Sequence, residues 1–353
     1  MTEISGIEPW RSEQLVLCRD DRVGLRAAIA IDDTTLGPGL GGVRCVSYPT
    51  DQAAITEAQR LAAAMTLKNA SAGLPYGGAK SVILAPGPHV DRHALMRRFG
   101  EFIARTGGAY LPGVDMGTST RDLAMIGESG AEVSCSDEDP SPWTALGVAF
   151  AVRATVAHLD RREELEGVRV LIQGAGHVGA ALAHDLAADG AVILVADVDA
   201  ERAASVAAAV DGHVVAPADV IGTECDIYAP CAIARVVSPE NASRLRCRAI
   251  VGAANDTLTH DSDAELLAEL DITYVPDFIA NAGGVIHIHA LRAKHDEQRL
   301  RSDVAQIGGR VLDLLDAAEH ESKTPLALAE ERVRRLLAGK RQKPARRPEV
   351  VRT

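Results

Sequence analysis

GVRVLIQGAGHVGAALAHDLAADGAVILVADVD, residues 167–199, carries the most specific pattern in the chain. An apolar run over 168–173 predicts a buried strand, and G-x-G-x-x-G follows it at 174–179. The alanine- and leucine-rich stretch after the glycines predicts a helix, and a second apolar run over 191–196 ends in Asp197. Strand, glycine turn, helix, strand and acidic residue in this order are typical of a dinucleotide-binding βαβ unit.

Each glycine of this pattern has a physical task. Gly174 makes the tight turn, Gly176 lets backbone approach a pyrophosphate, and Gly179 permits close helix–strand packing. The pyrophosphate lies at the helix N-terminus, where unpaired N–H groups and the dipole favour an anion. Asp197 is expected to accept hydrogen bonds from the adenine ribose and to repel a 2′-phosphate, which favours NAD over NADP. The alternative is a doubly wound domain that binds no dinucleotide.

Short apolar runs downstream continue the strand–helix alternation. Residues 213–215, 226–230, 247–251 and 272–276 predict further parallel strands of the same sheet. Polar tips follow the last two runs and include Asn255 and Asn281. Ligands bind outside the carboxyl ends of such strands, so both asparagines are candidate ligand-binding residues, although either could be only a turn residue.

A second stretch, MTLKNASAGLPYGGAKSVI at 65–83, places Lys68 and Lys80 twelve positions apart. We expect a helix over 52–66, a turn at Gly77-Gly78 and a strand over 80–84. A lysine set against glycines and an apolar strand is costly unless it is paired or its pKa falls. Two surface lysines flanking a turn would give the same pattern.

Glycine-rich segments surround this stretch. Pro38, Gly39, Gly41 and Gly42 predict a loop, and Asp115 is expected in a turn between Gly113 and Gly117. A carboxylate on a loop before a helix can be a helix cap or a catalytic acid, and the residues alone leave both open.

Composition limits the classes of protein and partner. A length of 353 residues predicts two domains, with the boundary at the proline-containing segment before the long apolar helix of 140–159. A net charge of -12 argues against nucleic acid or an anionic membrane as partner. The chain has no apolar run of transmembrane length and a polar N-terminus without a signal peptide, so we expect a cytoplasmic protein. The six cysteines lack metal-site spacing, and we expect no metal.

The motifs, taken in order, resemble the leucine, valine and phenylalanine dehydrogenases, which are relatives of glutamate dehydrogenase. The resemblance rests on GGVR at 41–44, MTLKNASAGLPYGGAK at 65–80, GVDMGT at 113–118, PSPWTALGV at 140–148, GAGHVG at 174–179, APCA at 229–232, GAAND at 252–256 and PDFIANAGGVIH at 276–287. It implies an α/β protein of two domains, an N-terminal α/β substrate domain and a Rossmann-type doubly wound NAD-binding domain, with an active-site cleft between them. We expect a substrate-binding and oligomerisation domain over 1–142, an NAD-binding domain over 143–320, a helix at 321–338 that packs back on the first domain, and a basic disordered tail at 339–353.

The resemblance implies NAD-dependent oxidative deamination of an apolar L-amino acid to its 2-oxo acid and ammonia, by a homo-oligomer. It gives Lys80 and Asp115 the catalytic roles: Lys80 activates water, and Asp115 exchanges protons with the substrate amino group. Lys68 binds the substrate carboxylate. The other implied substrate residues are Gly41, Gly42, Asn281, Leu40, Gly113, Val285 and Ile288, and the implied cofactor residues are Gly174, Gly176, His177, Val178, Gly179, Asp197, Thr144 and Asn255.

The departures from the family pattern are Ala79, Val114, Asp256 and a shorter segment before PSPWT at 140–144, and none of them removes a catalytic residue. The expected side-chain pocket is apolar, so a charged substrate such as glutamate is disfavoured. Gly113 favours a bulky or aromatic side chain, whereas Val285 and Ile288 favour a branched one. Two alternatives remain: a 2-hydroxy-acid dehydrogenase, for which His287 and His289 are candidate bases, and a catalytically silent NAD-binding protein.

Overall fold

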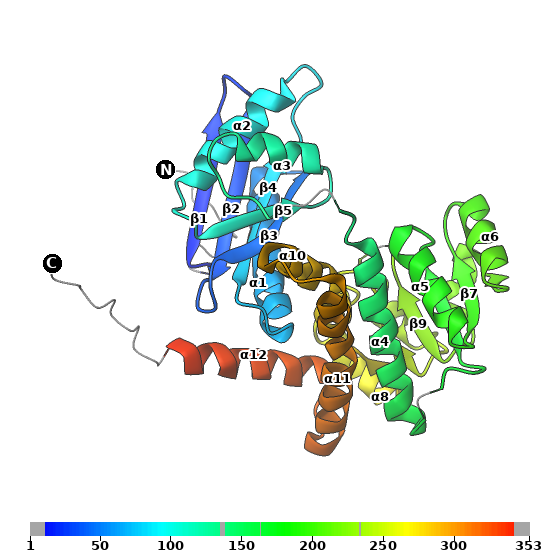
Figure 1. Cartoon of the computed structure of the whole chain (residues 1–353). Helices are drawn as coiled ribbons and strands as arrows, with labels where there is room; N and C mark the ends of the chain where they lie inside the picture. The colour runs from blue at the N-terminus through cyan, green and yellow to red at the C-terminus, as the bar shows by residue number, and fades with distance from the viewer. Residues whose placement is uncertain (1–10, 135–137, 163, 233, 342–353) are drawn as a thin grey trace. The chain divides into compact units, whose positions relative to one another are not determined.

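The computed structural model of the chain describes residues 11–134, 138–162, 164–232 and 234–341 (Figure 1). The chain folds into two compact units, each built on one β-sheet. Unit 1 comprises Met1–Ala70, Pro75–Val133 and Glu330–Thr353, and unit 2 comprises Ser71–Leu74 and Ser134–Ala329.

The sheet of unit 1 is mixed and has the strand order β1-β2-β4-β3-β5. Strand β2 is antiparallel to β1 and β4, whereas β3 is parallel to β4 and β5. The strands are β1 (Gln14–Asp20), β2 (Leu25–Asp33), β3 (Gly39–Val46), β4 (Gly77–Leu84) and β5 (Tyr110–Val114), and the helices are α1 (Asp51–Ser71), α2 (Arg92–Ala104), α3 (Thr120–Gly127) and the part of α12 (Pro325–Arg341) from Glu330 onward.

Helix α1 packs on one face of this sheet through small side chains. Ala28 and Ala30 of β2 form one buried cluster with Ala58 and Ala62 of α1. Side chains alternate along a strand, so Ile29 points to the opposite face, where α2 packs against β2. Lys80 is the direct partner of Ala30 across the sheet and therefore lies on the face that α1 covers.

Two predicted irregular segments of unit 1 are regular strand. The expected loop at Gly39–Gly42 is the start of β3, and the expected Gly77-Gly78 turn is the start of β4. Both predictions were wrong because these glycines serve close approach rather than turning. A Cβ on Gly41 would stand 1.7 Å from the Ala79 carbonyl oxygen, and one on Gly78 would stand 2.2 Å from the Thr66 nitrogen of α1.

The sheet of unit 2 has six parallel strands in the order β11-β10-β9-β6-β7-β8. All the strands predicted in this half of the chain are present. The strands are β6 (Arg169–Gln173), β7 (Val192–Ala196), β8 (His213–Val214), β9 (Ile227–Pro230), β10 (Ala249–Ile250) and β11 (Thr273–Tyr274). The helices are α4 (Ser141–Asp160), α5 (His177–Ala188), α6 (Ala200–Ala209), the 3-10 helix η1 (Pro217–Gly222), α7 (Pro239–Ala242), α8 (Asp263–Glu269), α9 (Asp277–Ala280), α10 (Gly283–Ala293) and α11 (Glu297–Glu321).

The strand order of unit 2 reverses at its centre. From β6 the chain runs outward through β7 and β8, then returns to β9 on the other side of β6. The carboxyl ends of β6 and β9 are therefore the topological switch point, where open α/β sheets bind their ligands. The predicted glycine turn follows β6 and begins at this point.

The last described helix returns the chain to unit 1. Val333 and Leu337 of α12 pack against Ala70, and Arg341 forms an ion pair with Asp33. Residues 342–353 of the predicted basic tail lie outside the described residues. Of the cysteines, Cys18, Cys45, Cys225 and Cys247 are buried free thiols and Cys231 is half-buried, while Cys135 lies outside the described residues.

Candidate active site

A buried ion pair joins Lys80 and Asp115 in unit 1. Lys80 projects from the middle of β4 and is 6% exposed. Asp115 directly follows β5, and its Oδ2 accepts a hydrogen bond from the Lys80 Nζ. A charged lysine in this position is stable only because a carboxylate faces it.

The electrostatics of the pair favour proton transfer. Burial lowers the pKa of Lys80, and it outweighs the Asp115 carboxylate, which acts to raise that pKa. Burial acts to raise the pKa of Asp115, but the charges of Lys80 and Arg44 outweigh it and lower that pKa. Asp115 thus remains an anion, while Lys80 loses its proton more readily than an exposed lysine, as a general base requires.

Arg44 extends the pair into a chain of alternating charges and was not assigned a role from the sequence. Its Nε lies 3.1 Å from the Asp115 Oδ1, and its Nη1 lies 3.0 Å from the Glu57 Oε1 of α1. Glu57 in turn binds Arg60 at 2.8 Å. Two-residue alternation from Gly42 would have placed Arg44 on the Asp115 side of the sheet, but only with 39–46 recognised as a strand.

Gly42 makes room for this arrangement. A Cβ on Gly42 would stand 2.7 Å from the Asp115 Cβ and 3.1 Å from its Oδ2. Strand β3 pairs Gly42 with Gly113 of β5, so two residues without side chains lie side by side next to the carboxylate. Leu40, two residues earlier in β3, is buried, with 1% of its surface exposed.

Lys68 lies in the last turn of α1, which extends beyond the predicted helix of 52–66, and is half-buried. The neighbouring Asn69 ties this helix end to the strands, because its Nδ2 donates to the Gly77 carbonyl oxygen at 2.6 Å and to the Leu40 carbonyl oxygen at 3.3 Å. The two lysines thus belong to one unit, on a helix and a strand that are hydrogen-bonded to each other.

The glycine turn of unit 2 has the geometry that a dinucleotide needs. Gly174 has a φ of +109°, and a Cβ on Gly179 would stand 1.8 Å from the Gly174 carbonyl oxygen. At Gly176 a Cβ would meet no atom of the described part of the chain within 4 Å, so this backbone faces open space. Gly176 is the N-cap of α5 and offers no side-chain acceptor to the helix. These residues fit a pyrophosphate at the helix N-terminus, with His177 exposed and Val178 half-buried beside it.

The neighbouring strand ends hold the turn in place. The Cys231 nitrogen donates to the Gln173 carbonyl oxygen at 2.7 Å, and a Cβ on Gly174 would stand 2.6 Å from the Ala232 Cβ. The Asp197 Oδ2 accepts from the Ala175 nitrogen at 2.7 Å. Asp197 therefore fixes the glycine turn in addition to its expected contact with ribose.

The remaining predicted residues of unit 2 form two groups. The Asn281 Nδ2 donates to the Asn255 Oδ1 at 3.0 Å, and the buried Asn281 Oδ1 has no hydrogen-bond partner among the described residues. Thr144, near the start of α4, lies close to the start of α10, because a Cβ on Gly284 would stand 2.9 Å from the Thr144 Oγ1. The half-buried Val285 and Ile288 lie on α10.

The structure thus groups the predicted residues by unit. Unit 1 holds Lys80, Asp115, Lys68, Gly41, Gly42, Leu40 and Gly113, and unit 2 holds the predicted cofactor residues with Asn281, Val285 and Ile288. The segment before α4 was missed: Glu138 lies 3.1 Å from the buried His287 of α10, and Asp139 lies 3.3 Å from His177.

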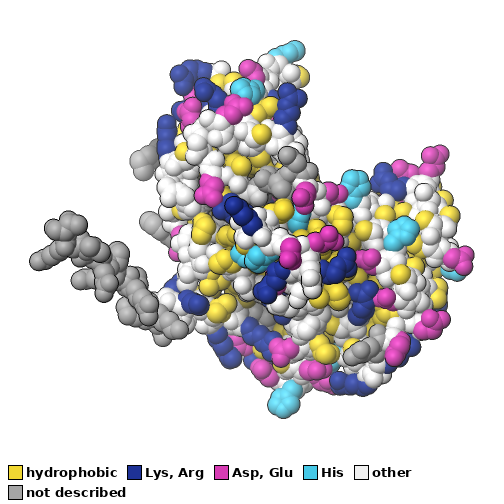
Figure 2. All heavy atoms as spheres, in the orientation of Figure 1, with side chains coloured by type: hydrophobic (Ala, Val, Ile, Leu, Met, Phe, Trp, Pro, Cys, Tyr) yellow, Lys and Arg dark blue, Asp and Glu magenta, His cyan; other side chains and the backbone are white. Residues whose placement is uncertain are grey.

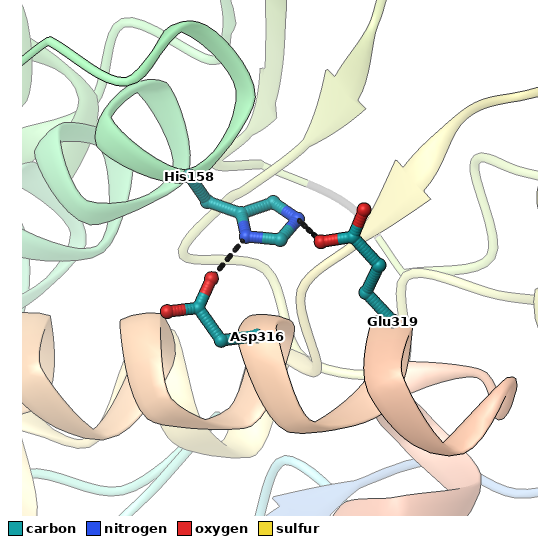
Figure 3. A group of neighbouring side chains, drawn as sticks. All are labelled: His158, Asp316 and Glu319. Atoms are coloured by element: carbon teal, nitrogen blue, oxygen red, sulfur yellow. Dashed lines mark hydrogen bonds and ion pairs between the residues drawn. The ribbon is translucent and has the colours of Figure 1, made fainter.

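Apart from the site residues, a cluster of potential metal ligands joins α4 to α11 (Figure 3). The His158 Nδ1 lies 2.7 Å from Asp316, and its Nε2 lies 3.9 Å from Glu319. Arg161 lies 3.5 Å from each carboxylate. Because the two ring nitrogens face different carboxylates and a cation is already present, we interpret this cluster as an ion-pair network between two helices.

The surface shows no strong segregation of charge on the side that Figure 2 presents, where acidic and basic side chains of the described residues are intermixed. Among the described residues, no helix has the length and apolar character needed to cross a membrane.

Known proteins share both units. Two family models match the chain: "Glu/Leu/Phe/Val dehydrogenase, dimerisation domain" over residues 13–130, and "Glutamate/Leucine/Phenylalanine/Valine dehydrogenase" over residues 196–307. Leucine dehydrogenase of Bacillus cereus is 37% identical over 338 residues, which cover 93% of this chain and 92% of that protein. Valine dehydrogenase of Streptomyces virginiae is 36% identical, with 90% of this chain and 91% of that protein covered. The crystal structure of L-tryptophan dehydrogenase from Nostoc punctiforme matches with a TM-score of 0.81 at 30% identity, covering 94% of this chain and 97% of that one.

Proposed function

The chain belongs to the Glu/Leu/Phe/Val dehydrogenase family, as its motifs predict, and from this we propose that it is an amino-acid dehydrogenase that uses NAD. The reaction converts an apolar L-amino acid, NAD⁺ and water into a 2-oxo acid, ammonium, NADH and a proton. The observation that carries the assignment is the buried Lys80–Asp115 pair beside Arg44, in a chain whose second unit carries the glycine turn of a dinucleotide site.

The family resemblance gives each residue a task, and the charge and position of the residue fit that task. Lys68 binds the substrate carboxylate at the end of α1. Asp115 takes a proton from the substrate amino group, so that the amine lone pair can drive departure of the α-hydrogen as hydride. The dinucleotide, when bound, supplies the hydride acceptor. Lys80, whose pKa burial lowers, then removes a proton from the water that attacks the imine carbon, and the resulting carbinolamine collapses to the oxo acid and ammonia.

The substrate side chain is apolar in this proposal. Leu40, Val285 and Ile288 carry no charge that could pair with a second carboxylate, which disfavours glutamate. Valine, leucine, isoleucine and phenylalanine are the candidates, and Gly113 leaves the room that an aromatic side chain needs.

NAD is the preferred dinucleotide in this proposal, because Asp197 follows β7 at the position that faces the adenine ribose. We also propose that the enzyme is a homo-oligomer, in keeping with the match of residues 13–130 to a dimerisation domain.

The test is formation of reduced dinucleotide with panels of L-amino acids and of 2-hydroxy acids. Turnover of apolar amino acids supports the proposal, and turnover of hydroxy acids alone overturns it. Lys80→Ala should lower kcat by about a thousandfold, within the range for a lost general base, while NAD still binds. Lys294→Ala, an exposed lysine of unit 2, is the control. A silent NAD-binding protein would bind the dinucleotide and turn over neither panel.

A further inference from the structure

Asp197 is largely committed to the fold around the dinucleotide turn. Its Oδ2 accepts from the Ala175 nitrogen at 2.7 Å, and its Oδ1 accepts from the Asp199 nitrogen at 2.8 Å. Only 7% of its side chain is exposed. A carboxylate offers about four acceptor positions, and the backbone nitrogen of Val198 also donates to this one, so about one position remains for a ribose hydroxyl. The charge of Asp197 repels a 2′-phosphate, and these hydrogen bonds hold the carboxylate in place.

Arg202 places a cation beside this fixed carboxylate. It lies in the first turn of α6, where its Nη1 is 3.8 Å from the Asp197 Oδ2 and its Nη2 donates to the Asp199 Oδ2 at 3.1 Å. Half of its side chain, 51%, is exposed. A guanidinium has five N–H donors in a planar fork that suits phosphate oxygens, and the bond to Asp199 uses one of them.

We propose that Arg202 is a specificity-determining residue for the dinucleotide: its guanidinium binds the 2′-phosphate of NADP and offsets the repulsion from Asp197. This inference rests on the proposed function, because it requires a dinucleotide on the turn after β6. Two carboxylates and one guanidinium leave one net negative charge at this place, so NAD remains preferred while NADP is tolerated.

The competing explanation is that Arg202 only stabilises the start of α6, through its ion pair with Asp199 three residues earlier. A structural role of this kind changes the binding of both dinucleotides alike. A contact with the 2′-phosphate changes only the binding of NADP.

The experiment is calorimetric titration of the full chain with NAD⁺ and with NADP⁺, which requires no turnover. Arg202→Gln should weaken NADP⁺ about five- to tenfold relative to NAD⁺, the scale of one charge-assisted hydrogen bond at a partly exposed site. Arg202→Lys should fall between the wild type and Arg202→Gln, because it keeps the charge but loses the fork. Arg244→Gln, an exposed arginine elsewhere in unit 2, is the matched control.

Asp199→Asn tests the proposed role of Arg202 through a gain, rather than a loss, of NADP⁺ affinity. Asparagine remains a good N-cap for α6, so the helix start is kept while the carboxylate that competes for Arg202 is removed. NADP⁺ should bind several-fold more tightly to this variant. The affinity of the wild type for NADP⁺ should also fall more steeply with salt than its affinity for NAD⁺, and Arg202→Gln should reduce that difference.

An unchanged ratio of NADP⁺ to NAD⁺ affinity in Arg202→Gln, with NAD⁺ still bound, overturns the inference and leaves the proposed function intact. A wild-type chain that binds neither dinucleotide overturns both.

Discussion

Lys80 and Asp115 influence each other's pKa. Both side chains are buried, and burial disfavours the charged form of each. Lys80 faces one carboxylate, whereas Asp115 faces the two cations Lys80 and Arg44. This asymmetry explains why both pKa values are lowered, although burial acts in opposite directions on an acid and a base. Removing one partner should therefore shift the titration of the other.

Lys80→Met should raise the pKa of Asp115. In the wild type that pKa lies below the ordinary value of 3.8, so ionised Asp115 stabilises the fold above this pH. The stabilisation is lost as pH falls through the folded-state pKa. Without Lys80, less charge opposes the effect of burial, which raises the pKa of Asp115, so the loss of stability should begin at a higher pH. A ¹³C titration of the aspartate carboxyls and acid unfolding followed by circular dichroism measure the two effects.

At alkaline pH, the effect of the same substitution on the pH dependence of stability has a defined direction. The folded-state pKa of Lys80 is lowered from 10.5, so the unfolded chain binds more protons between the two values and the wild type gains stability as pH rises through this window. Lys80→Met lacks that gain. Lys340→Met, an exposed lysine of unit 1, should behave like the wild type. Coincident acid unfolding of Lys80→Met and the wild type would mean that the pair is not coupled.

At the scale of elements, two glycines of the turn after β6 have different tasks: Gly179 serves packing, and Gly176 is proposed to serve dinucleotide binding. A Cβ on Gly179 would stand 1.8 Å from the Gly174 carbonyl oxygen, whereas one on Gly176 meets nothing within 4 Å. Gly179→Ala should cost about 1–3 kcal/mol of unfolding free energy or more, because α5 must move away from the strand end. Gly176→Ala should keep the stability of the wild type and lose at least about tenfold in NAD affinity, because its methyl group occupies space that the pyrophosphate needs.

Thermal unfolding and calorimetric titration of these two variants separate the roles. Normal NAD affinity in a stable Gly176→Ala protein would show that the dinucleotide does not approach this backbone. A Gly179→Ala protein as stable as the wild type would show that α5 can adjust without cost.

The sheet of unit 2 could be predicted from the sequence, because parallel strands buried on both faces appear as short apolar runs that end in glycine or polar residues. The sheet of unit 1 could not. Strand β3 begins Gly-Leu-Gly-Gly, and the rule that glycine marks a turn makes it a loop. What decides its structure is the approach of the Ala79 backbone to Gly41, a contact between segments far apart in the sequence.

The candidate site shows the same division. The roles given to Lys80 and Asp115 come from the family resemblance and that of the glycine turn from its own pattern, and all of these motifs are local in sequence. Arg44 joins Asp115 to Glu57 of α1, and this role depends on three elements that only the fold brings together. Asp197 also fixes the turn through the Ala175 nitrogen. This second task could not be inferred from the sequence, because it depends on the pairing of β7 with β6.

At the scale of the whole molecule, neither unit is one continuous stretch of the chain. Besides the short segment Ser71–Leu74, which belongs to unit 2, the chain leaves unit 1 after Val133 and returns to it at Glu330. The returning part of α12 buries Val333 and Leu337 against Ala70, near the end of the helix that carries Lys68. Removing the helix from Glu330 onward would expose this apolar cluster, so this part of α12 belongs to the folded core of unit 1.

The edge of the sheet in unit 1 offers a candidate surface for assembly of the proposed homo-oligomer. Strand β1 lies at one end of the strand order, and Leu17 in its middle is 54% exposed. An edge strand with an exposed large apolar side chain is a favourable surface for association with another copy. We therefore expect light scattering to give the mass of a homo-oligomer for the purified chain.

Leu17→Glu should weaken that association while leaving the fold intact. A carboxylate buried in an interface without a partner is costly, whereas at an exposed position it adds only local charge. The mass at low protein concentration should fall toward that of a single chain, and circular dichroism should match the wild type. Leu270→Glu, at a 39% exposed position in unit 2, is the control and should keep the full mass. An unchanged mass for Leu17→Glu would place the interface elsewhere on unit 1 or on unit 2, and a monomeric wild type would contradict the homo-oligomer itself.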